Sequence, residues 1–153
     1  PLLFEPLTLR DVTLRNRIGL SPMCQYSCGP DGAPNDWHVQ HLASRAAGGF
    51  GLIITEATAV EPIGRITPRD AGIWSDEHVA PWARVVRACK AMGAAVGIQL
   101  AHAGRKAGSA HPWSGLPRGS LPLGDGESAG GWQAVGASPV SFSPEYRVPR
   151  PLS

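Results

Sequence analysis

The chain has 153 residues, a formal net charge of +2 and only 17% charged residues. This length allows one domain with a sizeable hydrophobic core, and the low, scattered charge excludes the usual nucleic-acid or polyanion binder. Three cysteines are too few, and odd in number, for a disulfide scaffold.

The hydropathy pattern predicts no membrane partner. No apolar run approaches the roughly 18–20 residues that span a bilayer. Residues 1–5 lack both the basic and the apolar region of a secretion signal. We therefore expect a cytoplasmic protein.

The first predicted element is a hairpin within residues 1–17. Apolar and polar residues alternate over 7–14 on either side of Arg10 and Asp11, which is typical of two short strands. An apolar run then extends from Ile18 to Met23, and we interpret it as the first core strand. Pro22 lies in this run and has no N–H to donate to a sheet.

A helix and a second strand follow. Residues 28–36 have the composition of a turn, and Asn35 or Asp36 can cap a helix that ends at Gly48 and Gly49. Residues 52–57 form a nearly unbroken apolar run, which is typical of a strand covered on both faces.

The next repeat has the same order. After a loop over 61–73, Ser75 is a good helix start, although Pro81 favours a regular helix that begins one turn later. Cys89 falls at helical spacing and is expected to be a small buried hydrophobe. Gly93 ends this helix, and residues 96–101 predict a third buried strand. Short connections between these elements predict parallel strands joined by right-handed crossovers.

The last third of the chain shows no such pattern. Of the 50 residues from Gly104 to Ser153, 24 are Gly, Pro or Ser, which predicts a long loop or cap segment over 107–153. We expect at most one short hairpin there, formed by Val135, Val140 and Phe142.

Small or polar residues follow each predicted strand. They are Cys24 after the first strand, Glu56 and Ala57 at the end of the second, and Gln99 in the third. The carboxyl ends of parallel strands share one edge of a sheet, and a glutamine offers both a donor and an acceptor to a flat heteroaromatic ring. The alternative is that Cys24 and Ala57 fill the core and Gln99 is a hydrogen-bonded polar residue.

Other side chains offer competing chemistry. Cys24 and Cys28, with His38 and His41, are four ligands that zinc accepts, but their spacing fits structural zinc sites poorly, so we predict no metal. Helix capping or packing suits the two histidines better than catalysis.

Three residues after the third strand are further candidates. His102 follows that strand directly, and Arg105 and Lys106 can meet a phosphate or carboxylate or stay solvated. No glycine-rich dinucleotide motif follows any strand, so a Rossmann fold has no support.

Several segments together resemble the old yellow enzymes, in particular the thermophilic-like class with a cysteine near the flavin. The similar segments are 6–9, 14–18, Ser21-Pro22-Met23-Cys24-Gln25-Tyr26, 51–57, 64–65, 72–77 and 99–106. The resemblance is close over 4–106 and weak over 149–152.

This resemblance implies a TIM (β/α)₈ barrel that holds FMN, accepts hydride from NAD(P)H and reduces activated alkenes. By the same resemblance, the segment Ser21, Pro22, Met23 and Cys24 contacts the flavin ring, with Cys24 tuning its reduction potential. Ala57 is the small residue beside the ring, Gln99 binds its pyrimidine edge, and Tyr26 touches substrate. A homo-oligomer is expected for the complete enzyme.

The chain departs from the family in its extent. A full barrel needs about 250 residues, whereas this chain offers an N-terminal hairpin, three core strands with two helices over 18–106, and the segment 107–153. The substrate-binding histidine pair, the tyrosine proton donor and the flavin-binding arginines of the later strands are absent. We therefore expect the N-terminal portion of one FMN-binding barrel, which works with a C-terminal half or another copy. The alternative is a catalytically inactive piece that binds protein.

Overall fold

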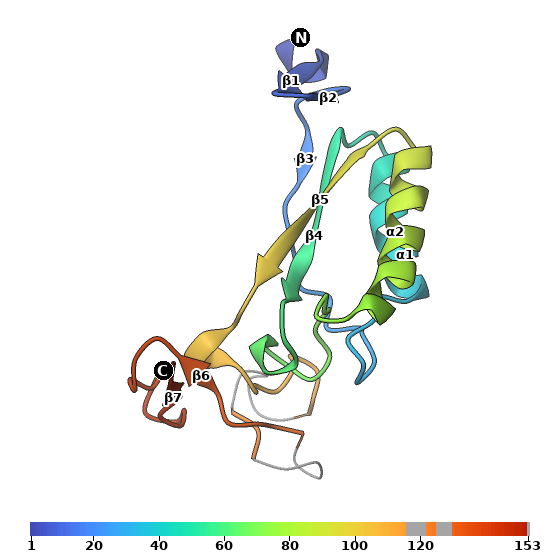
Figure 1. The fold of residues 1–153 in the computed structure, drawn as a ribbon. Coiled ribbons are helices and arrows are strands. Elements are labelled where there is room, and N and C mark those ends of the chain that lie inside the picture. The colour runs from blue at the N-terminus through green and yellow to red at the C-terminus, as the bar shows by residue number, and fades with distance from the viewer. Residues whose placement is uncertain (116–121, 125–129, 153) are drawn as a thin grey trace.

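A computed structural model describes residues 1–115, 122–124 and 130–152. Its centre is a parallel sheet with the strand order β3 (Gly19–Leu20), β4 (Leu52–Ala59) and β5 (Ala95–Ala101). Helix α1 (Asp36–Ala47) connects β3 to β4, and α2 (Val79–Ala91) connects β4 to β5. Both helices lie on the same side of the sheet (Figure 1). The predicted parallel βαβ order is confirmed.

The hydrophobic core lies between this sheet and the two helices. Ile53 of β4, Val85 of α2 and Leu42 of α1 are buried in it. Cys89 is completely buried in the same cluster, which confirms its expected role as a small hydrophobe. Each large apolar side chain buried in this way contributes roughly 1.5–3 kcal/mol.

Two histidines complete the helix starts. Asn35 caps α1, and its backbone N–H donates to Nδ1 of His38 over 3.0 Å. Ser75 and His78 repeat this arrangement at the short 3₁₀ turn Asp76–His78. This is a capping box in which histidine takes the place of glutamate. The regular part of α2 begins at Val79, a turn after Ser75, with Pro81 in its first turn.

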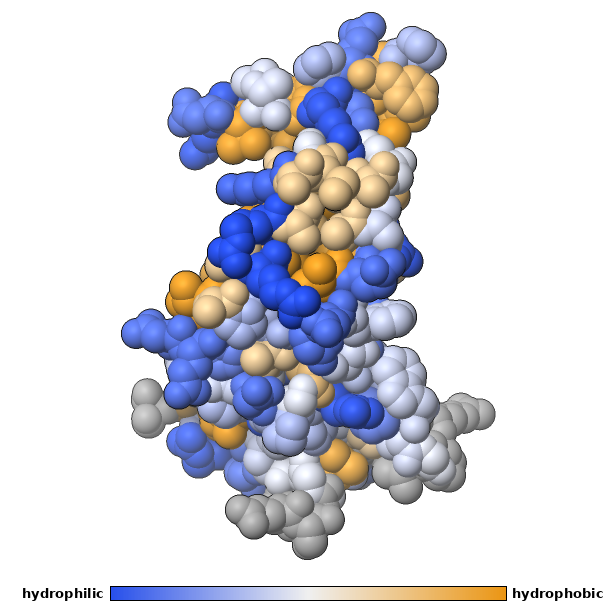
Figure 2. Space-filling model, turned by 90° about the vertical axis from the view of Figure 1, so that its right-hand side faces the viewer, coloured by the Kyte–Doolittle hydropathy of each residue, from blue (hydrophilic) through white to orange (hydrophobic). Residues whose placement is uncertain are grey.

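The N-terminal hairpin is confirmed. Strands β1 (Leu7–Leu9) and β2 (Val12–Leu14) pair antiparallel after a 3₁₀ turn at Leu2–Phe4. The hairpin lies beyond the amino ends of the sheet strands (Figure 1). Apolar side chains gather at this end of the molecule (Figure 2), where Phe4 is 61% exposed.

The first core strand is shorter than predicted. Only Gly19 and Leu20 pair with β4, whereas the sequence predicts a strand that continues to Met23. Pro22 has no backbone N–H and therefore cannot continue the ladder. Residues 21–24 leave the sheet as an exposed or half-exposed segment.

The C-terminal segment contains no hairpin of the predicted kind. Strand β6 (Val135–Gly136) pairs in parallel with β7 (Arg150–Pro151), so the hairpin expected from Val135, Val140 and Phe142 is wrong. Pro139 lacks the N–H that a returning strand would have needed, and Val140 and Phe142 are exposed in the connection between the strands. Residues 116–121, 125–129 and 153 of the predicted loop lie outside the described residues.

Across the described ranges, no helix is long and apolar enough to cross a membrane.

Candidate active site

Three of the predicted site residues meet at the carboxyl end of the sheet. Ala57 of β4 is paired with Gln99 of β5. The Cys24 thiol, in the segment that follows β3, lies close enough to the backbone of Ala57 for that backbone to influence its pKa. The shared rim that the sequence predicts is therefore present in the structure: Ala57 and Gln99 lie on neighbouring strands, and Cys24 lies in the segment that follows β3.

A bulge in β4 separates two kinds of side chain at this rim. The register with β5 shifts between Thr55 and Ala57, so Glu56 is an extra residue without a partner in β5. Bulges re-aim side chains and occur next to active sites. Here Ala57 stays paired beside Gln99, while the Glu56 side chain is 3% exposed and contacts the start of α1.

Burial and charge keep the two candidate catalytic groups protonated. Burial raises the pKa of the Cys24 thiol, and the negative charges of Asp70 and Glu56 raise it further. Burial, followed by the neighbouring Cys24, raises the pKa of Tyr26 to about 12. The two side chains lie close enough for each to influence the pKa of the other. At neutral pH the site thus presents a neutral thiol and a neutral phenol.

The backbone of Tyr26 is in the left-handed region, with φ at +50°. Non-glycine residues adopt this conformation rarely, and where they do, the surrounding structure must hold them there. The Tyr26 ring packs edge-on against Trp113, with centroids 5.7 Å apart. Because the left-handed position is occupied by a tyrosine and not by a glycine, the sequence does not indicate this turn.

Most of the predicted flavin contacts are accessible to solvent. Ser21, Met23 and Gln99 are exposed, and Pro22 is half-buried. The Gln99 side-chain amide makes no hydrogen bond with any residue in the described part of the chain. Its donor and acceptor are therefore available to a ligand.

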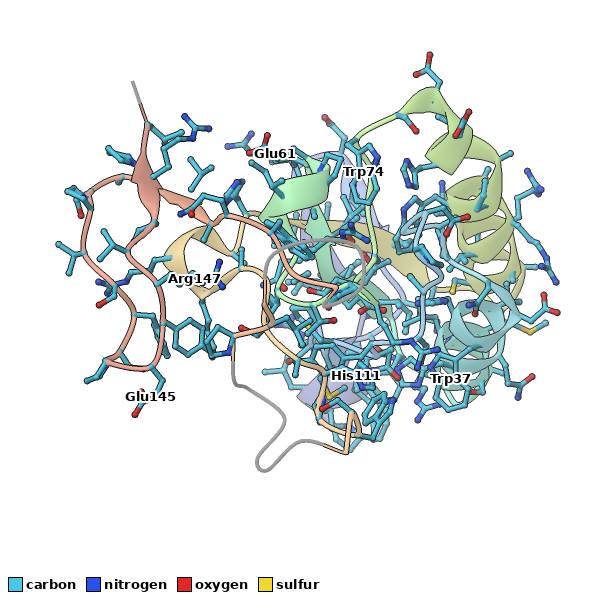
Figure 3. All side chains as sticks on the ribbon, turned by 90° about the horizontal axis from the view of Figure 1, so that it is seen from below. Trp37, Glu61, Trp74, His111, Glu145 and Arg147 are labelled. Carbon is cyan, nitrogen blue, oxygen red and sulfur yellow. The ribbon has the colours of Figure 1, made fainter. Side chains whose placement is uncertain are left out.

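The two histidines of α1 have the capping and packing roles predicted for them. His38 is 1% exposed, with Nδ1 in the helix cap and Nε2 3.1 Å from Oε1 of Glu56. His41 stacks on Trp37, with ring centroids 6.0 Å apart. Burial, together with the nearby Arg45, lowers the pKa of His41. Figure 3 shows Trp37 at the start of α1.

The zinc alternative is not assembled. Cys28 lies 3.5 Å from Nε2 of His38, but burial strongly raises its pKa, whereas zinc binds the thiolate. Among the described residues no group of three or more His, Cys, Asp or Glu side chains is arranged to hold a metal ion.

The candidates after β5 contact two different segments, the loop after β4 and the C-terminal segment. His102 pairs with Glu61 over 2.7 Å. Arg105 contacts the backbone of Ser141, and Lys106 lies over the Phe142 ring. Phosphate or carboxylate binding by Arg105 and Lys106 stays a prediction.

One part of the site was missed by the sequence analysis. The N–H of Gln25 donates to Oε2 of Glu56 over 2.9 Å, and the Gln25 side chain accepts from the Trp37 indole over 3.1 Å. These contacts anchor the loop that carries Cys24 and Tyr26. The available signal was the single charged residue, Glu56, in an otherwise uncharged strand.

Comparison with known proteins decides the family. The model of the NADH:flavin oxidoreductase / NADH oxidase family matches residues 2–126. The chain belongs to this family.

Among curated members, the NADPH dehydrogenase of Bacillus subtilis (strain 168) is 56% identical over 106 residues. That match covers 69% of this chain and 31% of the relative. A second NADPH dehydrogenase, from Geobacillus sp. (strain WCH70), is 57% identical with the same coverage. The chain therefore spans about a third of the length of these relatives.

Solved members share the fold. Morphinone reductase in complex with tetrahydroNAD is 28% identical, with a TM-score of 0.77 over 100% of this chain and 41% of the other. An old yellow enzyme from Pichia sp. is 28% identical, with a TM-score of 0.66 over 70% of this chain and 28% of the other. The predicted fold class is thus confirmed: the chain corresponds to the N-terminal part of an old yellow enzyme TIM barrel.

Proposed function

We propose that this chain forms the flavin-binding start of an FMN-dependent NAD(P)H oxidoreductase that reduces activated C=C bonds of enones and related electrophiles. It does so together with the polypeptide that supplies the remaining strands, and we call this complex the assembled barrel. The observation that carries the proposal is the rim formed by Ala57 and Gln99 on two neighbouring parallel strands and by Cys24 in the segment that follows the third strand of the sheet, β3.

The residues at the rim fit a flavin ring. Ala57 carries only a methyl group, so a flat ring can approach the strand there. The free amide of Gln99 offers one donor and one acceptor side by side, which matches the alternating polar edge of a pyrimidine. The segment of Ser21, Pro22, Met23 and Cys24, which is exposed or half-exposed, would contact the ring. Bound there, FMN supplies the transfer of hydride from NAD(P)H to an electron-poor alkene.

Cys24 and Tyr26 have different tasks in this proposal. The neutral Cys24 thiol would contact the flavin and adjust its reduction potential. A group that donates or accepts a hydrogen bond near the ring changes the energy of the charged states of the flavin. Tyr26 retains its proton at neutral pH, since its pKa is raised to about 12. Its hydroxyl therefore donates a hydrogen bond to the carbonyl oxygen of an enone and polarises the alkene.

Turnover by the assembled barrel tests this function. FMN is added to the assembled barrel, and NADPH oxidation is followed with 2-cyclohexenone as the acceptor. We expect enone-dependent oxidation that requires FMN. A folded, flavin-loaded complex without turnover would contradict the proposal, and a stable complex that binds no flavin would favour the protein-binding alternative.

A substitution at the rim adds a binding readout. Gln99→Leu keeps the size of the side chain but removes its donor and acceptor, so FMN affinity should fall about tenfold, as expected for lost hydrogen bonds in a site shielded from water. Gln40→Leu, on the exposed face of α1, is the matched control and should leave FMN affinity unchanged.

A further inference from the structure

The loop that carries Cys24 and Tyr26 is tied to the start of α1 through Gln25. The backbone N–H of Gln25 donates to Oε2 of Glu56 over 2.9 Å. The Gln25 side chain accepts from Nε1 of Trp37 over 3.1 Å and donates to the carbonyl oxygen of Met23 over 2.8 Å. Both flanking residues, Cys24 and Tyr26, are thereby fixed by the residue between them.

The other oxygen of Glu56 is held by the helix cap. Nδ1 of His38 lies 3.0 Å from the backbone N of Asn35, whose N–H it accepts, and 3.1 Å from Oδ1 of Asn35. We assign the ring proton to Nε2 because the backbone N–H can only donate. Nε2 is 3.1 Å from Oε1 of Glu56 and donates to it. A hydrogen bond to a carboxylate is about twice as strong as one between neutral groups. The capping box thus selects the tautomer that the buried carboxylate needs.

The Glu56 carboxylate reaches this position because of the bulge in β4. Glu56 is an extra residue without a partner in β5, so its side chain does not follow the alternation of side chains between the two faces of the strand. Ala57 remains on the rim beside Gln99. The same bulge therefore places the rim residue and the carboxylate that anchors the facing loop.

We propose that Glu56 and His38 are positioning residues that hold the Cys24–Tyr26 loop in its left-handed turn against the end of β4. The consequence for the reaction rests on the proposed function: this pair sets where the Cys24 thiol and the Tyr26 hydroxyl stand relative to the flavin.

The first test measures the Cys24 thiol and requires no flavin. In the assembled barrel without FMN, Glu56→Gln replaces one of the two acceptor oxygens by an NH₂ group, so either the Gln25 N–H or the His38 ring N–H loses its acceptor. Alkylation of Cys24 by iodoacetamide is located by peptide mapping and compared as the limiting rate of the fully ionised thiol, so that loss of the Glu56 charge does not act through the Cys24 pKa. This limiting rate should rise about tenfold, the order expected when a segment loses a hydrogen bond to a charged group. An unchanged rate in a folded variant would overturn the proposal.

The matched control is Asp36→Asn. Asp36 is the first residue of α1, is exposed, and pairs with Arg84 of α2 without contacting the loop. The same change from carboxylate to amide should leave the Cys24 rate as in the wild type. Equal acceleration in both variants would show a general loosening of α1 and would contradict a specific role of Glu56.

A second variant keeps the proposal testable if Glu56→Gln does not fold. Trp37→Phe removes the indole donor to Gln25 and keeps an aromatic ring to stack on His41. Because Trp37 is 51% exposed, the core is untouched. The Cys24 rate should rise here too, by a smaller factor. No rise in Trp37→Phe would show that the Gln25 anchor does not control Cys24.

The flavin-loaded assembled barrel separates positioning from simple support. Glu56→Gln and Cys24→Ala should each shift the flavin midpoint potential, and the shifts should not add in the double variant, because Glu56 acts through Cys24. Additive shifts would overturn this coupling. If the assembled barrel binds no flavin, the proposed function fails, whereas the alkylation result still decides the positioning role.

Discussion

Cys24 is the residue whose protonation most directly reports on the site. Its pKa is raised above the ordinary value of 9.0, so the folded protein holds this proton more tightly than the unfolded chain does. The thiolate therefore forms only at higher pH, and the stability that the neutral thiol contributes is present below pH 9 and lost as pH rises through the folded-state pKa.

Alkylation rates across pH check this sign. In a Cys28→Ala/Cys89→Ala background of the assembled barrel, the Cys24 rate should still be rising at pH values where a free cysteine has reached its plateau. If the Cys24 rate instead reaches its plateau at a lower pH than the rate of free cysteine, the site stabilises the thiolate. That result would contradict the tuning role of a neutral thiol.

Tyr26 should affect one half of the reaction. Tyr26→Phe removes the hydroxyl that polarises the enone carbonyl. Reduction of the flavin by NADPH does not use this hydroxyl. Oxidation of the reduced flavin by 2-cyclohexenone should slow by about tenfold or more, while reduction by NADPH should stay nearly unchanged. Stopped-flow measurement of both half-reactions decides this.

Tyr146→Phe is the control for the loss of a hydroxyl. The buried Tyr146 hydroxyl forms a hydrogen bond with the Ser109 hydroxyl, 3.1 Å away in the C-terminal segment. This variant should change thermal stability more than either half-reaction. Equal losses in both half-reactions for Tyr26→Phe would assign Tyr26 a packing role instead.

Among the elements, helices α1 and α2 share one side chain, that of Arg15, which binds carbonyl oxygens at the C-terminal ends of both. Arg15 donates from Nη1 to the carbonyl oxygen of Met92 over 2.8 Å, and from Nη2 to those of Ala46 and Phe50. Helix C-termini leave carbonyl oxygens without partners and favour positive charge. A single guanidinium thus satisfies the C-terminal ends of both helices.

Removal of this guanidinium should loosen both helix ends at once. Arg15→Ala in the assembled barrel should lower the free energy of unfolding by about 2–4 kcal/mol, since several hydrogen bonds to a charged group are lost. Denaturant unfolding followed by circular dichroism measures it. Arg17→Ala, at an exposed position two residues further along, should cost much less, and similar losses in both variants would contradict the role of Arg15.

The sequence predicted elements whose signals are local. Asn35, Ser75 and Gly93 marked helix ends, and the apolar runs at 52–57 and 96–101 marked buried strands. Features that depend on pairing were not visible. The bulge at Glu56 exists only relative to β5, and β6 finds its partner around Arg150 rather than at the nearer Val140.

The candidate site follows the same rule. Cys24, Ala57 and Gln99 were predicted to meet because parallel strands align their carboxyl ends. The contact between Gln25 and Glu56 was not predicted, because it requires both the bulge and the left-handed backbone of Tyr26. Neither leaves a characteristic residue pattern in the sequence.

At the scale of the whole molecule, the sheet has open edges. Within the described residues, β3 and β5 each pair only with β4, so the outer edge of β5 presents unpaired backbone groups. Leu100 and Ile98 of β5 are 63% and 38% exposed. The view in Figure 1 shows both helices on one side of the sheet and none on the other. Open strand edges and exposed apolar residues of this kind favour association.

We therefore predict that residues 1–153 on their own do not form a stable monomer and bind FMN weakly or not at all. A domain is stable by only roughly 5–15 kcal/mol, and a closed barrel would bury the face of β4 and β5 that is open here. Intact mass, sedimentation and a flavin absorption spectrum of the isolated chain test this prediction. We expect aggregates, or complexes with a further polypeptide or a second copy, that carry little flavin. A monomer of 16.1 kDa that unfolds cooperatively and binds FMN tightly would show that three strands suffice without barrel closure.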